Sequence, residues 1–238
     1  MGIDMMSIAE AKKGVRKQLL EERKNIPALL KEQKSHEICE QLISFIQDTL
    51  SQTDYVKIEA PKKLDTPCCS PRPNEPEESS PEAHPFTLGA YAPLAQEVDI
   101  HEALAFAYTH HIRICFPCMH TEPVNGLPFT MRAVTLEQYR HNSAPFVPNP
   151  LKRFVYRDAA LEEFAEVSPQ SFDGIIIPLV GFDSSHKRLG YGGGNYDRFL
   201  ARVPSSCRLI GVGFREQYRY KLPTDGYDIA LDTIIHDE

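Results

Sequence analysis

The residues best suited to chemistry lie in one short stretch, from Arg188 to Asp197, between an apolar run and a helical pattern. Arg188 supplies a permanently charged, forked guanidinium that matches phosphate oxygens. Glycines without Cβ atoms let consecutive backbone N–H groups form an anion-binding nest: Gly190, Gly192, Gly193 and Gly194. A helix that begins near Tyr196 points its first N–H groups at the same place. The stretch predicts phosphate binding, although a flexible glycine turn explains the pattern equally well.

The spacing of these glycines excludes two common nucleotide-binding loops. The Gly-x4-Gly-Lys-Ser/Thr spacing is absent, and so is Gly-x-Gly-x-x-Gly with an acidic residue about twenty positions later. Any phosphate held here is therefore held by a different loop.

A second group of cations lies near the N-terminus and consists of Lys12, Lys13, Arg16 and Lys17. Ser7 precedes Glu10 by three residues, so a capping box predicts that a helix begins there. Cations near a helix start oppose the helix dipole. On pattern alone they favour a solvated face over an anion site.

Apolar periodicity predicts the elements that position these residues. Residues 7–50 have the helical period, and Pro27 divides them into two helices. A helix over 100–110 and a short helix over 161–165 follow, with strands over 86–91, 112–116, 175–178 and 209–213. The alternation predicts one α/β domain over residues 1–238 with a mostly parallel sheet covered by helices. Residues 59–85 are rich in Pro, Glu and Ser and predict a mobile insertion within it.

Composition excludes several classes of protein. Among 238 residues, 33 are acidic and 26 basic, and the formal net charge of −7 argues against a nucleic-acid-binding surface. No run of apolar residues is long enough for a membrane span, and the N-terminus lacks a secretory pattern, so we expect a cytoplasmic location.

Six scattered cysteines predict reduced thiols. Cys115-Phe-Pro-Cys118 with His120 has a zinc-like spacing, but buried strand residues explain it better because no second ligand pair is apparent.

Further motifs extend the pattern over nearly the whole chain: Lys12-Lys-Gly-Val-Arg16, Tyr91-Ala-Pro-Leu-Ala-Gln-Glu97, Ile114-Cys-Phe-Pro117, Asn149-Pro150, Gly213-Phe-Arg-Glu-Gln217 and Asp228-Ile-Ala-Leu-Asp232. With Gly-Phe-Asp183, Arg188-Leu-Gly-Tyr-Gly-Gly-Gly and Tyr196-Asp197-Arg198, they resemble the signature of the 5-formyltetrahydrofolate cyclo-ligase, or 5,10-methenyltetrahydrofolate synthetase, family. Only residues from about 51 to 85 lie outside the resemblance. It implies a monomer with a three-layer α/β fold, in which helices flank a mixed, mostly parallel central sheet.

The resemblance also implies an activity, the cyclisation of 5-formyltetrahydrofolate to 5,10-methenyltetrahydrofolate with ATP and Mg²⁺. In the family mechanism ATP phosphorylates the formyl oxygen, N10 attacks the activated carbon, and phosphate leaves.

By position, Lys12, Arg16 and Arg188 are implied to be catalytic and to contact phosphates. The other implied nucleotide contacts are Lys13, Gly14, Val15, Leu189, Gly190, Tyr191, Gly192, Gly193, Gly194, Asn195 and Tyr196. The implied Mg²⁺ ligands are Asp197 and Asp228, and the implied contacts to the reduced folate are Tyr91, Ala92, Glu97 and Asn195.

The chain departs from the family pattern within the glycine stretch. Asn195 replaces the first Tyr of a usual Tyr-Tyr-Asp, and Tyr191 and Gly193 occupy positions that are basic in some members. Since the chain has no Trp, Tyr91 and Phe146 are the candidate aromatic walls for the pterin. Two alternatives stay open: a folate- or nucleotide-binding paralogue without turnover, supported mainly by Asn195, and a phosphosugar isomerase or coenzyme A transferase with the same phosphate loop.

Overall fold

The computed structural model describes residues 7–52 and 85–238. The predicted insertion at 59–85 falls on the gap between these ranges, outside the described residues apart from its last position. Two helices come first, α1 (Ile8–Lys24) and α2 (Ala28–Gln52), and Pro27 separates them as predicted. The predicted capping box begins α1, because Ser7 Oγ accepts the Glu10 N–H at 3.2 Å and the Glu10 carboxylate accepts the Ser7 N–H at 3.1 Å.

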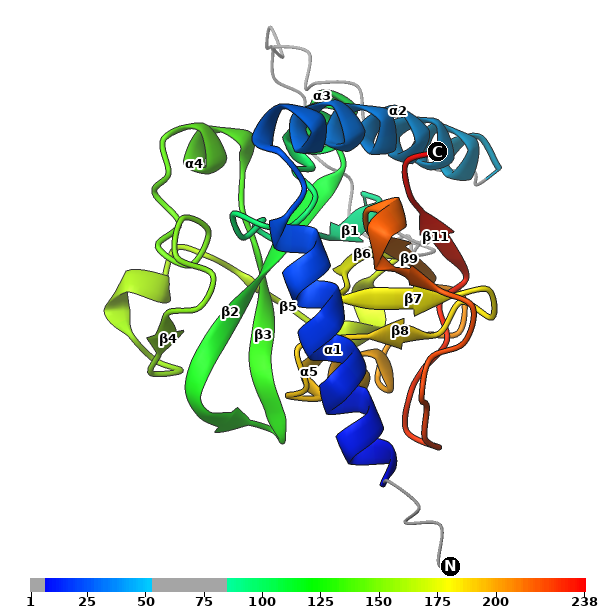
Figure 1. Ribbon diagram of the computed structural model, residues 1–238. Coiled ribbons are helices and arrows are strands. Elements are labelled where there is room, and N and C mark those ends of the chain that lie inside the picture. Colours follow the sequence, from blue (N-terminus) through cyan, green and yellow to red (C-terminus); the bar gives the residue numbers. More distant parts are fainter. Residues whose placement is uncertain (1–6, 53–84) are drawn as a thin grey trace, which may run out of the picture.

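An eight-stranded mixed sheet forms the centre of the fold, with the order β11-β9-β6-β1-β2-β3-β5 and with β4 beside β2 (Figure 1). Its strands are β1 (Thr87–Gly89), β2 (Arg113–Val124), β3 (Leu127–Ala133), β4 (Arg153–Phe154), β5 (Glu166–Val167), β6 (Gly174–Pro178), β9 (Arg208–Val212) and β11 (Thr233–Ile235). All neighbours from β11 to β2 are parallel, whereas β3 is antiparallel to both β2 and β5. The predicted mixed, mostly parallel α/β sheet is confirmed.

Alternate residues of the central strands face two different layers. Ile176 of β6 packs in the apolar core that includes α2 and α3 (His101–Thr109). Its neighbours Ile175 and Ile177 pack in the core that includes α5 (Asn195–Leu200). Successive side chains of a strand point to opposite faces, so an unbroken apolar run is what a sheet covered on both sides requires. The three layers follow from this pattern.

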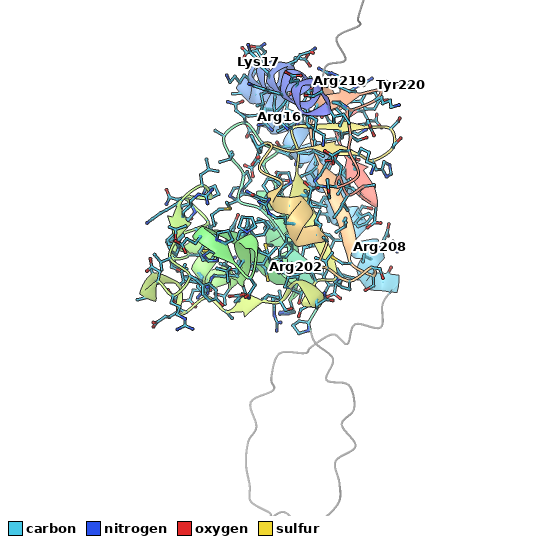
Figure 2. All side chains as sticks on the ribbon, turned by 90° about the horizontal axis from the view of Figure 1, so that it is seen from below. Arg16, Lys17, Arg202, Arg208, Arg219 and Tyr220 are labelled. Carbon is cyan, nitrogen blue, oxygen red and sulfur yellow. The ribbon has the colours of Figure 1, made fainter. Side chains whose placement is uncertain are left out.

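A smaller sheet carries the glycine-rich stretch. It consists of β10 (Tyr218–Arg219), β7 (Gly181–Asp183) and β8 (Arg188–Leu189), in that order. Helix α1 runs beside this sheet in Figure 1, and Figure 2 shows Arg16 of α1 and Arg219 of β10 at the same end of the molecule. The helix packs Leu19 into a small apolar cluster with Val180, Leu189 and Leu222. Burial of a leucine side chain stabilises such packing by about 1.5–3 kcal/mol. Helix α1 is thereby fixed beside the strand from which the glycines depart.

Two features differ from the sequence-based predictions. The strand predicted over 112–116 continues to Val124 and turns back into β3 through Asn125 and Gly126, whose φ angles are +50° and +77°. The short helix predicted over 161–165 is wrong in position, because a 3-10 helix spans Ala159–Leu161 instead.

The remaining short helices are α4 (Leu136–Arg140) and the 3-10 turns Pro169–Ser171 and Arg215–Gln217. Within the described ranges, no helix combines the length and the apolar character that a membrane crossing requires.

Candidate active site

A cleft of about 860 Å³ lies at the carboxyl ends of β1 and β6, the edge at which open α/β sheets hold their ligands. Four segments that are distant in the sequence form much of its lining and supply its polar side chains: Lys12 and Arg16 of α1, Tyr91, Ala92 and Glu97 after β1, all residues of 188–198, and Asp225, Tyr227 and Asp228 before the last strand. Pro117 and Met119 of β2, Phe129 of β3, Pro150, Leu151 and Pro178 also line it. Most of the predicted site residues therefore meet in one place.

The glycine loop, residues 190–194, closely approaches helix α1. Gly192 and Gly194 have φ angles of +101° and +61°, which side-chain-bearing residues rarely adopt. A Cβ at Gly192 would lie 3.2 Å from Cζ of Arg16. Arg16 Nε also donates a hydrogen bond of 2.7 Å to the Gly190 carbonyl. The guanidinium thus lies against bare backbone, which explains why the loop needs glycine here.

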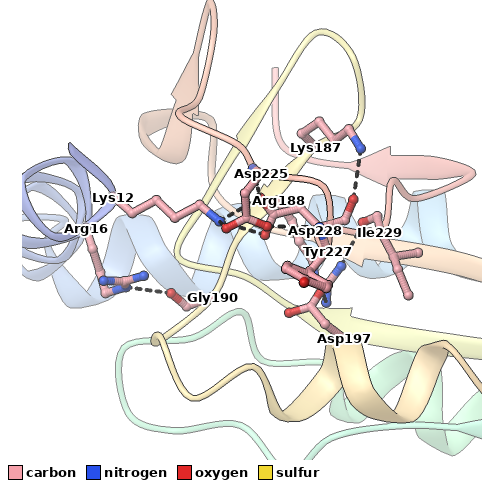
Figure 3. A network of polar contacts seen from close by, with 10 residues as sticks. All are labelled: Lys12, Arg16, Lys187, Arg188, Gly190, Asp197, Asp225, Tyr227, Asp228 and Ile229. Carbon is pink, nitrogen blue, oxygen red and sulfur yellow. Dashed lines mark hydrogen bonds and ion pairs between the residues drawn. The ribbon is translucent and has the colours of Figure 1, made fainter. Parts of the chain in front are cut away.

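A lysine held between two carboxylates forms the Lys12 cluster, which consists of Lys12, Asp225 and Asp228 (Figure 3). Lys12 Nζ lies 2.8 Å from Asp225 Oδ2 and 2.6 Å from Asp228 Oδ2. Burial of Lys12 disfavours its charge, but the hydrogen bonds and charges of the two aspartates outweigh burial and raise its pKa. The cation that α1 brings to the cleft therefore stays charged.

Arg188 is a buried cation at the cleft, 7% exposed, whereas Lys12 is half-buried. Its Nη2 donates to Asp197 Oδ1 at 2.6 Å, and its Nη1 donates to the Ile229 carbonyl at 2.9 Å (Figure 3). Lys187 Nζ binds the backbone carbonyl of Asp228 at 2.9 Å and so ties the two segments together. Lys12 and Arg188 therefore pair with aspartates in the cleft, and Arg16 lies beside the glycine loop, an arrangement suited to a phosphate chain and a hard metal ion.

Glu97 also lines the cleft, beside Tyr191 of the glycine loop, and is almost fully buried. Its Oε2 accepts the Leu94 N–H at 2.9 Å, and its Oε1 accepts the Tyr191 hydroxyl at 2.9 Å. Burial raises the pKa of Glu97, although both hydrogen bonds act against that rise. Tyr91 donates its hydroxyl to the Val98 carbonyl at 2.8 Å, which fixes its ring in the wall beside Ala92.

Asn195 also lines the cleft, where its side-chain oxygen accepts Arg198 Nη2 at 3.0 Å. The ring that the family pattern usually carries at this position is thus replaced by a polar amide that is already hydrogen-bonded. Tyr196 lies next to it in the lining and contacts Phe129 with its ring centroid 5.5 Å away. Aromatic surface on this wall therefore comes from Tyr196 and Phe129.

The structure does not bring four predicted residues to the cleft. Lys13 and Gly14 are exposed on other faces of α1, and Val15 packs on the apolar cluster of Leu19. A helix turns by about 100° per residue, so only one face of the segment from Lys12 to Arg16 can point at the glycine loop. Phe146 is 1% exposed and packs on Phe164 in the core, so it forms no wall of the cleft.

The zinc-like spacing on β2 does not form a metal site in the described part of the chain. Cys115 and Cys118 pack in the cores on opposite faces of the sheet, and His120 Nε2 lies 2.9 Å from Thr130 Oγ1. The described residues hold no group of three or more candidate metal ligands. An odd spacing on a strand places two side chains on opposite faces, so Cys-x-x-Cys cannot converge on one ion there. Both thiols are buried, as the strand interpretation predicted.

Sequence reasoning missed three residues of this region. Asp225 and Tyr227 line the cleft beside Asp228, and the Asp-x-x-Asp spacing in a loop was the available signal. Arg23 is 3% exposed and donates to the Tyr191 hydroxyl at 2.7 Å. Its position seven residues after Arg16, two helical turns along one face, was the signal for it.

The fold and the cleft define an open-sheet α/β protein with a glycine loop beside cations at its ligand edge. A family model described as the 5-formyltetrahydrofolate cyclo-ligase family matches residues 84–237, more than half of the chain. The chain belongs to this family.

Similar proteins agree with this assignment. A Mycoplasma pneumoniae protein named 5-formyltetrahydrofolate cyclo-ligase is 38% identical over 77 residues, 32% of this chain and 46% of the relative. One from Escherichia coli K12 with the same name is 28% identical over 151 residues, 63% of this chain and 76% of the relative. The chain thus spans less than half the length of the Mycoplasma relative that it matches.

Two solved structures share the fold. A 5,10-methenyltetrahydrofolate synthetase from Mycoplasma pneumoniae aligns with a TM-score of 0.61 at 22% identity, covering 95% of this chain and 99% of the other. One from Aquifex aeolicus aligns with a TM-score of 0.60 at 21% identity, covering 94% and 89%. Both carry the α/β architecture described above, and the predicted family and fold are confirmed.

Proposed function

We propose that this chain catalyses the ATP- and Mg²⁺-dependent cyclisation of 5-formyltetrahydrofolate to 5,10-methenyltetrahydrofolate. The observation that supports this most is the meeting of Lys12, Arg16 and Arg188 with the glycine loop in one cleft. The same cleft also holds a buried carboxylate, Glu97, and aromatic rings. A phosphate site and a heterocycle site are what a reaction between ATP and a folate needs.

The chemistry explains why phosphate groups are required. A formyl oxygen is a poor leaving group, so the γ-phosphoryl group of ATP is first transferred to it and ADP is released. N10 then attacks the activated formyl carbon, and the C–O bond breaks as phosphate leaves with the former formyl oxygen. Phosphoryl transfer needs positioning and charge neutralisation more than a protein nucleophile. Cations on a preorganised loop supply both.

We assign the three cations different places in this step. Arg188 is buried and fixed by Asp197 and the Ile229 carbonyl, so it is our choice for the transferred phosphoryl group. Lys12 and Arg16 come from α1, and Arg16 already lies against the glycine loop, so they are assigned to the other phosphates. The backbone N–H groups of residues 190–194 complete the cradle, and Leu189 and Tyr196 flank it.

The carboxylates of the cleft fit Mg²⁺ by the chemistry of their donors. Mg²⁺ prefers hard oxygen ligands and is commonly held by one or two carboxylates together with substrate phosphates. Asp197 and Asp228 line the cleft next to Arg188 and Lys12, so they would hold the ion while the cations hold the phosphates. When bound, the ion would neutralise charge on the ATP oxygens.

The substrate end of the cleft is assigned to Tyr91, Ala92, Glu97 and Asn195. A carboxylate accepts hydrogen bonds from the N–H groups of a pterin, and Glu97 is the buried carboxylate at this end. The chain is proposed to act as a monomer in the cytoplasm, which rests on the resemblance and the sequence pattern alone.

A folate- or nucleotide-binding paralogue without turnover is the second candidate, and Asn195 favours it. The measurement that separates the two follows the absorbance band of methenyltetrahydrofolate in a mixture of the protein, 5-formyltetrahydrofolate, Mg²⁺ and ATP. Growth of the band only when ATP is present supports the cyclo-ligase. A preparation that binds ATP or folate in calorimetry but produces no band contradicts it, and Asn195→Tyr is then the first restoration to test. An isomerase or transferase would act on its own substrates without ATP.

A further inference from the structure

A chain of directed hydrogen bonds joins helix α1 to the substrate end of the cleft through the glycine loop. Arg23 Nη2 donates to Tyr191 Oη at 2.7 Å, and Tyr191 Oη donates to Glu97 Oε1 at 2.9 Å. Arg23 Cζ also lies 5.7 Å from the centre of the Tyr191 ring, and its Nη1 donates to the Leu179 carbonyl at 3.3 Å. Both Arg23 and Glu97 are more than nine-tenths buried.

The direction of these bonds is set by which groups can accept. A guanidinium has only donors, so the Tyr191 oxygen must accept from Arg23 and its single proton is left for Glu97. Glu97 Oε1 then accepts from Tyr191, while Oε2 accepts the Leu94 N–H. Two of about four acceptor positions on the carboxylate are used, and two stay available to a ligand.

One face of helix α1 contacts the glycine loop at two places, the backbone of Gly190 and the side chain of Tyr191. Arg16 binds the Gly190 carbonyl, and Arg23, two helical turns further on, binds the Tyr191 side chain. Tyr191 therefore belongs to the phosphate loop by its backbone and to the Glu97 corner by its hydroxyl. Phenylalanine could fill the same space but could not make this connection.

We propose that Tyr191, held by Arg23, is a positioning residue that keeps Glu97 an acceptor aimed into the cleft and links the phosphate loop to substrate recognition. The ligand class is a planar heterocycle with adjacent N–H donors. The part of this inference that concerns substrate affinity rests on the proposed function. The part that concerns the state of Glu97 does not.

The protonation of Glu97 depends on a small number of neighbours. Charged Arg23 of α1 and the hydroxyl of Tyr191 favour the carboxylate, as does the Leu94 N–H, whereas burial opposes it and raises the pKa. Tyr91 and Tyr196 face Glu97 from other elements, and the Glu97 charge raises the pKa of each in addition to their burial. Loss of the Tyr191 hydroxyl removes a bond to the charged form, so the pKa of Glu97 must rise further.

The direct test is a carboxyl-carbon NMR titration of the full chain labelled at glutamate, with Glu97→Gln identifying the Glu97 signal. We expect Tyr191→Phe to raise the pKa of Glu97 by about 1 pH unit. Tyr220→Phe is the matched control, because Tyr220 is 84% exposed and lies outside the cleft lining. It should leave the signal unchanged. Equal Glu97 titration in Tyr191→Phe and in the parent would overturn the proposal.

Steady-state kinetics of Tyr191→Phe distinguish a failure of the role assigned to Tyr191 from a failure of the proposed function. Tyr191→Phe should raise KM for 5-formyltetrahydrofolate about tenfold while kcat at saturation stays within about threefold. The acid limb of kcat/KM should move to higher pH, since Glu97 then loses its charge earlier as pH falls. A parent protein with no turnover would refute the proposed function, while the NMR titration would still decide the role of Tyr191. A loss confined to kcat would contradict positioning.

Discussion

Two lysines of this chain are each held between two carboxylates, one in the cleft and one outside its lining. Lys12 of α1 lies between Asp225 and Asp228, and Lys34 of α2 lies between Glu216 and Asp237. The lysine side chains are similarly covered, 15% and 13% exposed. In both, burial disfavours the charge and the paired carboxylates outweigh it, so both pKa values are raised.

The partners and the surroundings differ. Asp237 is 1% exposed at its side chain and also accepts the Arg215 N–H at 2.8 Å, so the Lys34 cluster, residues Lys34, Glu216 and Asp237, joins α2 to the end of the chain. It has no residue in the lining of the cleft, whereas all three members of the Lys12 cluster line it. A lysine with two carboxylates is therefore not a functional signal by itself, and the functional assignment of the Lys12 cluster rests on its position at the ligand edge of the sheet.

The largest effect on activity is expected from the loss of Arg188. Arg188→Ala should lower kcat by about a thousandfold with a smaller change in the KM for ATP, because its charge is most needed when the phosphoryl group transfers. Steady-state kinetics beside a thermal unfolding curve measure this. Turnover within about threefold of the parent would refute the role assigned to Arg188.

Matched substitutions of Lys12 and Lys34 test whether the two clusters differ in their contributions to activity and stability. Lys12→Met should lower activity about a hundredfold, whereas Lys34→Met should leave it within about threefold. Stability should show the reverse order, since Lys34→Met leaves buried Asp237 without its cation and should cost about 3 kcal/mol. Denaturant unfolding and the absorbance assay on both variants check this. Equal loss of activity in the two variants would remove the functional distinction between the clusters.

The pH dependence of stability tests whether the charge of Lys34 stabilises the folded state. The pKa of Lys34 is raised in the folded state above its ordinary value of 10.5. The stability that its charge contributes is therefore fully present below pH 10.5 and is lost as pH rises through the folded-state pKa. The difference in unfolding free energy between the parent and Lys34→Met should be constant near neutral pH and shrink above pH 10.5. A difference that shrinks already between pH 7 and 9 would contradict this assignment.

The carboxylates of the two clusters should differ in their response to Mg²⁺. Asp228→Asn should raise the Mg²⁺ concentration for half-maximal activity about tenfold, because it removes a proposed ligand. Asp237→Asn should leave that concentration unchanged and lower the melting temperature instead. Titration of Mg²⁺ at fixed ATP measures the first effect. An unchanged requirement in Asp228→Asn would place the ion elsewhere.

The smallest effect concerns the buried thiols. Burial raises the pKa of Cys39 and Cys118 to about 11 and that of Cys115 and Cys207 to about 12. Because the thiolate is the reactive form, these four cysteines should resist alkylation at pH 8 in the folded protein. Mass mapping of labelled peptides checks this, with urea-unfolded protein as the positive control. Rapid labelling of Cys115 or Cys118 would show that the sheet opens locally.

Local patterns predicted the elements well because local physics determines them. The Ser7 and Glu10 capping box, the break at Pro27 and the apolar run 175–177 each predicted what the structure contains. The glycine stretch predicted a loop, but the pattern of cations near the N-terminus favoured a solvated face and was wrong for Arg16, which lies against that loop as only the family resemblance implied. The β2–β3 hairpin was missed although Asn125-Gly126 is a common hairpin turn, since the polar residues near it hid the strand.

The features of the site that local sequence patterns did not predict depend on tertiary packing. Which face of α1 meets the loop is decided by the docking of Leu19. Val15 lies on the same apolar face four residues earlier, but the resemblance implied the whole segment from Lys12 to Arg16 and did not distinguish its faces. Phe146 and Tyr91 had equal aromatic character, but only Tyr91 reached the cleft. The contact between Arg23 and Tyr191 joins residues 168 positions apart, and no local pattern predicts such a pair.

The most direct test of the central claim follows the formyl oxygen itself. The substrate is prepared with oxygen-18 in the formyl group and converted with ATP and Mg²⁺, and the released phosphate is analysed by mass spectrometry. Transfer of the formyl oxygen to a phosphoryl group predicts one labelled oxygen in each phosphate released, with Lys34→Met behaving as the parent. Methenyltetrahydrofolate formed with unlabelled phosphate would contradict phosphoryl transfer as the step that this cleft catalyses.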